Sequence, residues 1–98
     1  MKRDVLIEKL RAARPALEAQ GVTHVALFGS RSRGDCRSDS DVDILLEVAP
    51  QSRFNMLDLV GVERLVSSAT GLVANAFMRT GLDSGFKSEI APDVVDIF

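Results

Sequence analysis

The amino-acid sequence predicts an α/β fold of the α+β kind, a sandwich in which helices pack against a small mixed β-sheet of about four strands. Two observations support this prediction. Apolar residues recur at three- and four-residue intervals in residues 4–20 and 54–66, which is typical of amphipathic helices. Short apolar runs rich in β-branched residues occupy 22–28 and 42–48, next to glycine or aspartate, and such runs are typical of strands.

The first helix is expected over residues 4–20. Pro15 lies inside it and lacks a backbone N–H, so it is predicted to kink the helix or to begin a fresh turn. Gly21 is expected to end the helix, and residues 22–28 then form the first strand. The apolar positions of this helix are Val5, Leu6, Leu10, Ala13 and Leu17.

After Pro50, Ser52 is expected to cap a second long helix that ends near residues 67–71. A third strand is predicted at 72–77, a short helix at 82–90 and a terminal edge strand at 94–98. The apolar positions of the long helix are Phe54, Leu57, Val60, Val62, Leu65 and Val66.

The composition limits the possible classes of protein. The 98 residues allow a single domain, 1–98, and the net charge of −2 gives no strong nucleic-acid signal. Any nucleic-acid contact would be local, through Arg31, Arg33 and Arg37. The lone Cys36 cannot form an internal disulfide, and no apolar run could serve as a signal segment or cross a membrane, so a cytoplasmic location is expected.

The most informative stretch pairs two aspartates at the start of the second strand. Side chains alternate between the faces of a strand, so Asp41 and Asp43 are expected to point the same way while Val42, Ile44 and Leu46 point the other way. Two neighbouring carboxylates repel each other. A divalent cation relieves that repulsion, and oxygen ligands of this kind suit Mg²⁺ held together with substrate phosphates.

A glycine turn precedes this strand. Gly29 permits a backbone turn that other residues resist, and Ser30 is expected to cap a short helix that runs to Gly34. Such a turn directs N–H groups and a hydroxyl toward an anion. A phosphate site on one side and a metal site on the other together predict a nucleotide site.

These residues resemble a known family signature. Gly29-Ser30, Arg33-Gly34 and Ser40-Asp41-Val42-Asp43 match, at the right separations, the G-S-x-A-R-G…S-D-x-D-L pattern of minimal nucleotidyltransferase (MNT) domains, which belong to the DNA polymerase β-like nucleotidyltransferase superfamily. Ser32 stands where the family usually has Ala, and Ile44 where it has Leu. The resemblance covers nearly the whole chain and is strongest over residues 22–48.

The residues between the two strands leave alternatives open. The charged loop could be a solvated connection, or Arg31 and Arg33 could contact a triphosphate or support the loop through Asp35. A calcium loop opening at Asp39 is excluded because Ile44 and Pro50 stand where Gly and Glu are needed. The glycine turn also lacks the Gly-Lys-Ser/Thr of a P-loop, so an ATPase of that class is not expected. His24 has no apparent partner for a catalytic triad, so a packed or edge histidine is expected.

The resemblance also implies a third carboxylate, on the strand after the long helix, that completes the metal site and helps to deprotonate the acceptor hydroxyl. The matching position is Asn75, whose amide offers one neutral oxygen, adds no negative charge and cannot act as a base. The nearby acids Asp58 and Glu63 lie on the predicted helix and are expected to face solvent.

The activity implied by the resemblance is transfer of a nucleotidyl group, AMP above all, from Mg²⁺-bound ATP or another NTP to an acceptor hydroxyl on a partner protein. Asp41 and Asp43 would bind Mg²⁺ as the catalytic pair, and Gly29, Ser30 and Arg33 would hold the phosphates. Similar domains are antitoxins paired with HEPN-domain toxins. The alternative is a degenerate nucleotidyltransferase that neutralises such a partner by binding alone, and a homo-oligomer is also possible.

Overall fold

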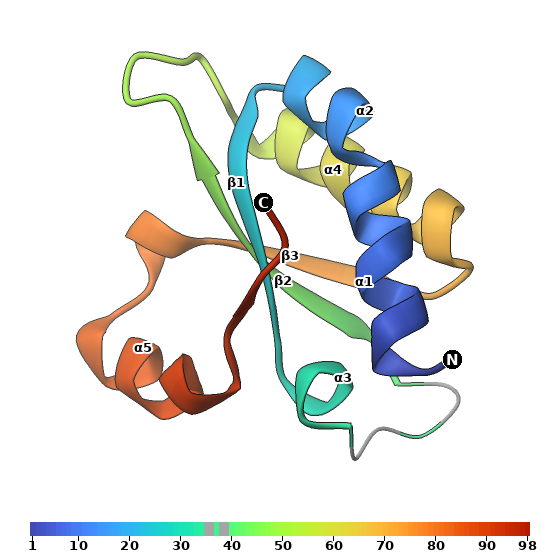
Figure 1. Ribbon diagram of the computed structural model, residues 1–98. Coiled ribbons are helices and arrows are strands. Elements are labelled where there is room, and N and C mark those ends of the chain that lie inside the picture. Colours follow the sequence, from blue (N-terminus) through green and yellow to red (C-terminus); the bar gives the residue numbers. More distant parts are fainter. Residues whose placement is uncertain (35–36, 38–39) are drawn as a thin grey trace.

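The computed structural model describes residues 1–34, 37 and 40–98. Its centre is a four-stranded mixed sheet in the order β3-β2-β1-β4. Strand β1 is antiparallel to β2 and to β4, whereas β2 and β3 are parallel (Figure 1). The predicted α+β architecture is therefore confirmed. The strands are β1 (Val22–Phe28), β2 (Val42–Val48), β3 (Ala74–Met78) and β4 (Val95–Asp96).

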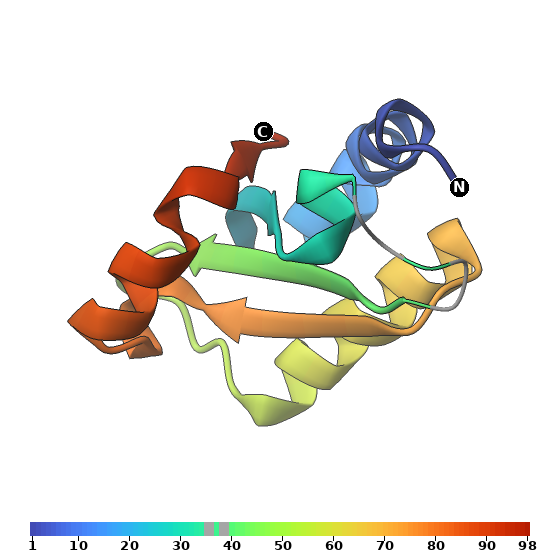
Figure 2. The ribbon, with the colours of Figure 1, turned by 90° about the horizontal axis from the view of Figure 1, so that it is seen from below.

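The helices divide between the two faces of the sheet. Helices α1 (Arg3–Ala12), α2 (Arg14–Ala19) and α4 (Met56–Thr70) cover one face, and α5 (Ser84–Ile90) lies on the other (Figures 1 and 2). We call these the covered face and the open face. A four-residue helix, α3 (Ser30–Arg33), follows β1 at the end of the sheet near the N-terminus.

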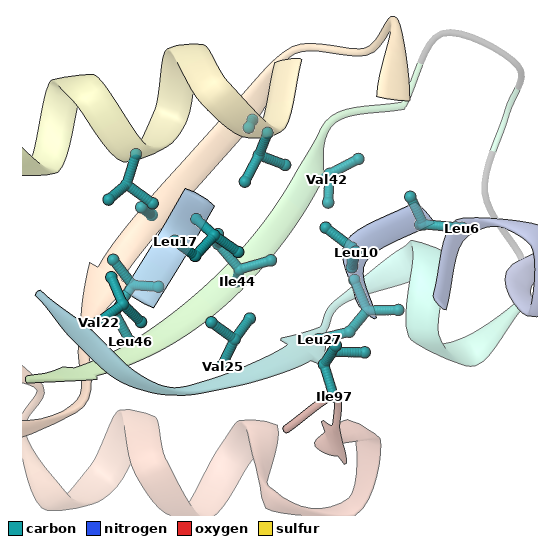
Figure 3. Packing of buried hydrophobic residues seen from close by; sticks show 14 residues of the cluster. Leu6, Leu10, Leu17, Val22, Val25, Leu27, Val42, Ile44, Leu46 and Ile97 are labelled. Carbon is teal, nitrogen blue, oxygen red and sulfur yellow. The ribbon is translucent and has the colours of Figure 1, made fainter. Parts of the chain in front are cut away.

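The main core lies on the covered face. Side chains from β1 and from alternate positions of β2 meet leucines of α1 and α2 there, and all of these side chains are essentially inaccessible to solvent (Figure 3). The alternation is the one predicted for residues 42–48, because every second side chain of a strand points to the same face. The members from these four elements are Leu6, Leu10, Leu17, Val22, Val25, Leu27, Val42, Ile44 and Leu46.

The N-terminal helical segment is broken where the sequence predicts. Helix α1 ends at Ala12, and α2 begins at Arg14 with Pro15 in its first turn, where a missing N–H removes no hydrogen bond. Pro15 thus begins a fresh turn. Gly21, at φ 96°, follows α2 and leads into β1, as expected.

The cap of α4 differs from the prediction. Asn55, not Ser52, is the N-cap: its side chain accepts hydrogen bonds from the backbone N–H groups of Leu57 (2.9 Å) and Asp58 (3.2 Å). The Asp58 carboxylate accepts in return from the Asn55 N–H at 2.9 Å, which completes a capping box. The Asp58 side chain is therefore part of the N-terminal cap of α4. Gly71, at φ 75°, ends the helix as predicted.

The C-terminal third keeps the predicted order of elements with shifted boundaries. Strand β3 starts at Ala74, two residues later than expected, and α5 starts at Ser84 because the Asp83 side chain caps the Phe86 N–H at 2.8 Å. Two 3₁₀ turns, η1 (Arg79–Gly81) and η2 (Ala91–Asp93), flank α5. Strand β4 lies at the sheet edge, as predicted, and is only two residues long. No helix in the described part of the chain is long and apolar enough to span a membrane.

Candidate active site

The predicted acidic pair lies at the start of β2, on the open face. Asp41 precedes the strand and Asp43 is its second residue. The side-chain amide of Asn75 donates hydrogen bonds to Asp41 Oδ2 at 3.0 Å and to Asp43 Oδ1 at 3.2 Å. Both carboxylates therefore point to the same side of the strand, as predicted from their spacing. Asn75 reaches them because β3 runs parallel to β2 with Asn75 opposite Asp43 in register.

The glycine turn packs directly against this acidic pair. Gly29 has φ 79° and ψ −160°, a backbone conformation that side chains resist. A Cβ at this position would lie 2.7 Å from Asp43 Oδ2, closer than van der Waals contact permits. Only glycine brings the backbone this close to the carboxylate. Gly29 is also the N-cap of α3, and Ser30 is its first residue rather than its cap, so the predicted capping role of Ser30 is wrong.

An open cleft of about 590 Å³ joins the turn and the second aspartate. It brings together the predicted residues Gly29, Ser30, Arg33 and Asp43, while the exposed Asp41 lies beside Asp43 outside the lining. Its other wall comes from the C-terminal third of the chain. The remaining lining residues are Phe28, Phe77, Phe86, Glu89, Ile90 and Asp93.

The two arginines of the loop have different positions. Arg31 is 2% exposed, and its Nε and Nη2 donate to the carbonyl of Ser40, at 3.2 and 2.9 Å. Ser40 is the residue before Asp41, so Arg31 supports the backbone that leads directly into β2. Arg33 lines the cleft and pairs with the Asp93 carboxylate at 3.0 Å. Asp35 and Cys36 lie outside the described residues.

The electrostatics of the acidic pair favour a cation. Burial raises the pKa of Asp43 above its usual value, and the neighbouring charge of Asp41 raises it further, while the hydrogen bond from Asn75 lowers it. The ionised pair is therefore costly, and within the described part of the chain the Asn75 amide donates to both carboxylates. A bound cation would supply the positive charge that these oxygens lack.

These residues fit a hard divalent ion by their chemistry. Carboxylate and amide oxygens are the ligands that Mg²⁺ takes when phosphates complete its coordination. Among the residues that the structure describes, no group of three or more His, Cys, Asp or Glu side chains gathers at one point. The site offers two carboxylates, with Asn75 where the family resemblance implies a third.

The aromatic wall of the cleft was missed by the sequence analysis. Phe28 makes edge-on contacts with Phe77 (5.6 Å between ring centroids) and with Phe86 (6.2 Å). Phe77 follows Asn75 by two residues and so shares its face, a signal that strand alternation offers. Phe86 comes from α5, and no local pattern connects it with the glycine turn.

Two further polar residues lie away from the cleft. His24 Nε2 lies 3.1 Å from Asp96 Oδ1 on the neighbouring edge strand, which agrees with the expected edge histidine. Glu63 is half-buried, and its carboxylate accepts the Ala76 N–H at 2.9 Å. The expectation that Glu63 faces solvent is wrong, because it satisfies a backbone donor at the outer edge of β3.

The fold matches solved structures. A candidate minimal nucleotidyltransferase has a TM-score of 0.70 and 25% identity, and the match covers 97% of this chain and 95% of that one. A chain from the complex of the tri-AMPylated HEPN toxin of Shewanella oneidensis with an MNT antitoxin has a TM-score of 0.67 at 12% identity, covering 98% of this chain and 71% of that one. The chain thus has the minimal nucleotidyltransferase fold.

Sequence comparison gives the family. Residues 7–97 match the nucleotidyltransferase domain family. The chain is 32% identical over 78 residues to the protein adenylyltransferase MntA of Thermococcus cleftensis, a match that covers 80% of this chain and 77% of that relative. The chain belongs to the nucleotidyltransferase domain family, which confirms the resemblance seen in the glycine turn and the paired aspartates.

Proposed function

We propose that this chain, as one domain over residues 1–98, transfers a nucleotidyl group, AMP in the simplest case, from an NTP to a hydroxyl of a partner protein. The observation that carries the proposal is the approach of the glycine turn to the acidic pair. A Cβ on Gly29 would lie 2.7 Å from Asp43 Oδ2, so the phosphate-sized turn and Asp43 meet at one cleft, with Asp41 beside Asp43 outside its lining. Similarity to a protein adenylyltransferase supports the same chemistry.

The proposed reaction is an in-line displacement at the α-phosphorus. The acceptor oxygen forms a new bond to phosphorus as the bond to the bridging oxygen breaks, pyrophosphate leaves with that electron pair, and the hydroxyl proton passes to water. The Gly29 backbone and the Ser30 hydroxyl bind the β- and γ-phosphates, and Arg33 supports them from the cleft wall. The phenyl rings of Phe77 and Phe86 offer an apolar surface for the nucleoside.

Asp41 and Asp43 would hold Mg²⁺, which when bound neutralises charge on the triphosphate oxygens. Asn75 keeps the two carboxylates side by side through its amide donor. Because an amide cannot accept the proton of the acceptor hydroxyl, this chain would activate its acceptor less strongly than a site with three carboxylates. Asn75 is therefore expected to slow transfer more than it weakens nucleotide binding.

The proposed partner is a HEPN-domain toxin, with this chain as the antitoxin acting in the cytoplasm. Complexes between MNT and HEPN proteins are among the structures that share the fold. The cleft has the size of a nucleotide site, and its acidic end borders the exposed Asp41. An acceptor hydroxyl from a second protein can approach there.

The test is incubation with ATP labelled at the α-phosphate, Mg²⁺ and the protein encoded by the neighbouring gene. We expect label on the partner, and a loss of about a hundredfold or more with Asp41→Asn/Asp43→Asn. The matched control is Asp4→Asn/Glu8→Gln, which removes the same charge from exposed positions of α1. Transfer that survives the first double substitution would overturn the assignment of the acids.

A second function is favoured by Asn75 alone: a degenerate nucleotidyltransferase that neutralises its partner by binding. This hypothesis predicts a tight complex, no label transfer, and no effect of the Asp41→Asn/Asp43→Asn change on binding. Asn75→Asp separates the two functions further. A slow enzyme gains transfer rate when the third carboxylate is supplied, whereas a pure binding module stays inactive.

A further inference from the structure

A second hollow lies on the open face, next to the proposed nucleotide cleft. Its volume is about 370 Å³, and the side chain of Ile90 borders both hollows. The lining combines an apolar floor with two cations and one acid. These residues are Leu45, Arg79, Leu82, Lys87, Ile90, Ala91, Val94 and Asp96.

Arg79 carries the inference. It follows the last residue of β3, and its Nε and Nη2 atoms are buried without a hydrogen-bond partner in the described chain. A guanidinium is charged at all accessible pH values, so leaving two of its nitrogens without water or an acceptor costs free energy. An anion bound in the hollow that Arg79 lines would offset that cost by supplying an acceptor.

The two unpaired nitrogens define the chemistry of that anion. The N–H bonds on Nε and on the neighbouring terminal nitrogen are parallel, and this edge of a guanidinium pairs with two oxygens of one carboxylate or phosphate. Lys87 adds a second positive charge to the lining. The one acid of the lining, Asp96, has His24 Nε2 at 3.1 Å from its carboxylate.

The apolar lining of the hollow indicates that the rest of the ligand is apolar. Leu45, Leu82 and Val94 present apolar surface, which a bare inorganic ion does not use. A volume of about 370 Å³ is within the range of small-molecule sites. Along β3, Arg79 is four residues beyond Asn75, about 13 Å at the usual rise of a strand, so an ion at Arg79 is separate from one at the acidic pair.

We propose that this hollow is a second ligand site, in which Arg79 binds the carboxylate or phosphate-monoester group of a small organic anion whose apolar part rests on Leu45, Leu82 and Val94. Nothing in the transfer of a nucleotidyl group requires this site. The inference therefore goes beyond the proposed function and is tested without nucleotide or metal.

The experiment is a nuclear magnetic resonance titration of the ¹⁵N-labelled chain with benzoate, phenyl phosphate and inorganic phosphate. We expect saturable shifts of the Arg79 Nε–H signal and of the amides around Leu45 with one or both organic probes, and weaker binding of inorganic phosphate. Benzoate and phenyl phosphate distinguish a carboxylate ligand from a phosphate ester. Arg79→Met should weaken the better probe about tenfold or more, while Arg53→Met, at an exposed loop position, should leave it unchanged.

Three results would overturn the proposal. One is the absence of any saturable shift at Arg79 in the parent chain, which is decisive even if Arg79→Met does not fold. Another is equal affinity of the parent and a folded Arg79→Met chain for the organic probes. The third is inorganic phosphate binding as tightly as phenyl phosphate, since the apolar floor would then contribute nothing.

Discussion

On the covered face of the sheet, Ile44 and Leu46 are fully buried beneath helices, whereas one residue away on the open face Asp43 borders a cleft. All three residues belong to β2, so this one strand contributes side chains to both faces of the sheet. Among the described residues, the covered face meets α1, α2 and α4, and the open face meets α5 and the turns beside it (Figure 1). Burial that stabilises the fold is thus concentrated on one side, and polar groups gather on the other.

The difference has a physical cause. A charged pair such as Asp41 and Asp43 cannot be buried without a large free-energy cost, so the face that carries it must stay accessible. The opposite face then supplies most of the apolar burial that holds a small domain together. Changes on the two faces should therefore affect different measured quantities.

The largest expected effect compares neighbouring residues of β2. Ile44→Ala should lower the free energy of unfolding by about 2 to 5 kcal/mol, because it leaves a cavity among tightly packed side chains. Leu45→Ala should cost less, about 1 to 3 kcal/mol, because Leu45 borders the second hollow and its removal enlarges a space already open to water. Urea unfolding measures both. Equal losses would show that the open face is packed as tightly as the covered one.

A second comparison tests the close approach at Gly29. Gly29→Ala should destabilise the chain by about 1 to 3 kcal/mol and displace the Asp43 carboxylate, because of its positive φ and the 2.7 Å contact. Gly34 has a similar φ of 83° with nothing within 4 Å of its Cβ position, so Gly34→Ala carries only the backbone cost. Thermal unfolding of both variants measures the difference between their losses of stability. If Gly34→Ala costs as much, the contact with Asp43 contributes nothing.

Asn75→Asp should show how the open face depends on a cation. Without metal, the change removes the donor shared by Asp41 and Asp43 and adds a third negative charge, so it should lower the free energy of unfolding by about 1 to 3 kcal/mol. We expect Mg²⁺ to restore most of this lost stability. Asn55→Asp is the control, since Asp caps a helix as well as Asn does. A loss that Mg²⁺ leaves unchanged would contradict a metal site at these acids.

The smallest effect concerns the charge of Asp43 in the metal-free chain. Burial raises the pKa of Asp43 in the folded state above the usual value of an aspartate, so ionisation costs more when the chain is folded. Its contribution to stability is present below the unfolded pKa and is lost as the pH rises through the folded pKa. Asp43→Asn should therefore unfold at an equal or higher temperature at neutral pH. A lower midpoint would mean that the carboxylate stabilises the fold.

Much of this fold follows from local sequence. Strands β1 and β2 begin and end at the predicted residues, because β1 is a mainly apolar run between two glycines and β2 is one that starts after Asp41 and ends just before Pro50. The start of α4 was missed because Ser52 and Asn55 are both good caps. The path of the chain after β2 decided between them, and no local pattern describes that path.

The candidate site was predicted in part for similar reasons. The glycine turn and the acidic pair are short motifs whose residue types limit what they can do. The contrast between Arg31 and Arg33 was not predicted, because both lie in one charged loop and only burial separates them. The roles of Asp41 and Asp43 in binding Mg²⁺ remain predictions that the experiments above address.

By itself, the sequence determined that Asp41 and Asp43 share a side of their strand and that Gly29 permits a sharp bend, because alternation and backbone freedom are properties of a few consecutive residues. Tertiary structure alone decided that the Asn75 amide bonds to both acids and that Phe86 lines the cleft. Such contacts depend on the register of distant strands and on how α5 packs, and both are set by the free energy of the whole fold.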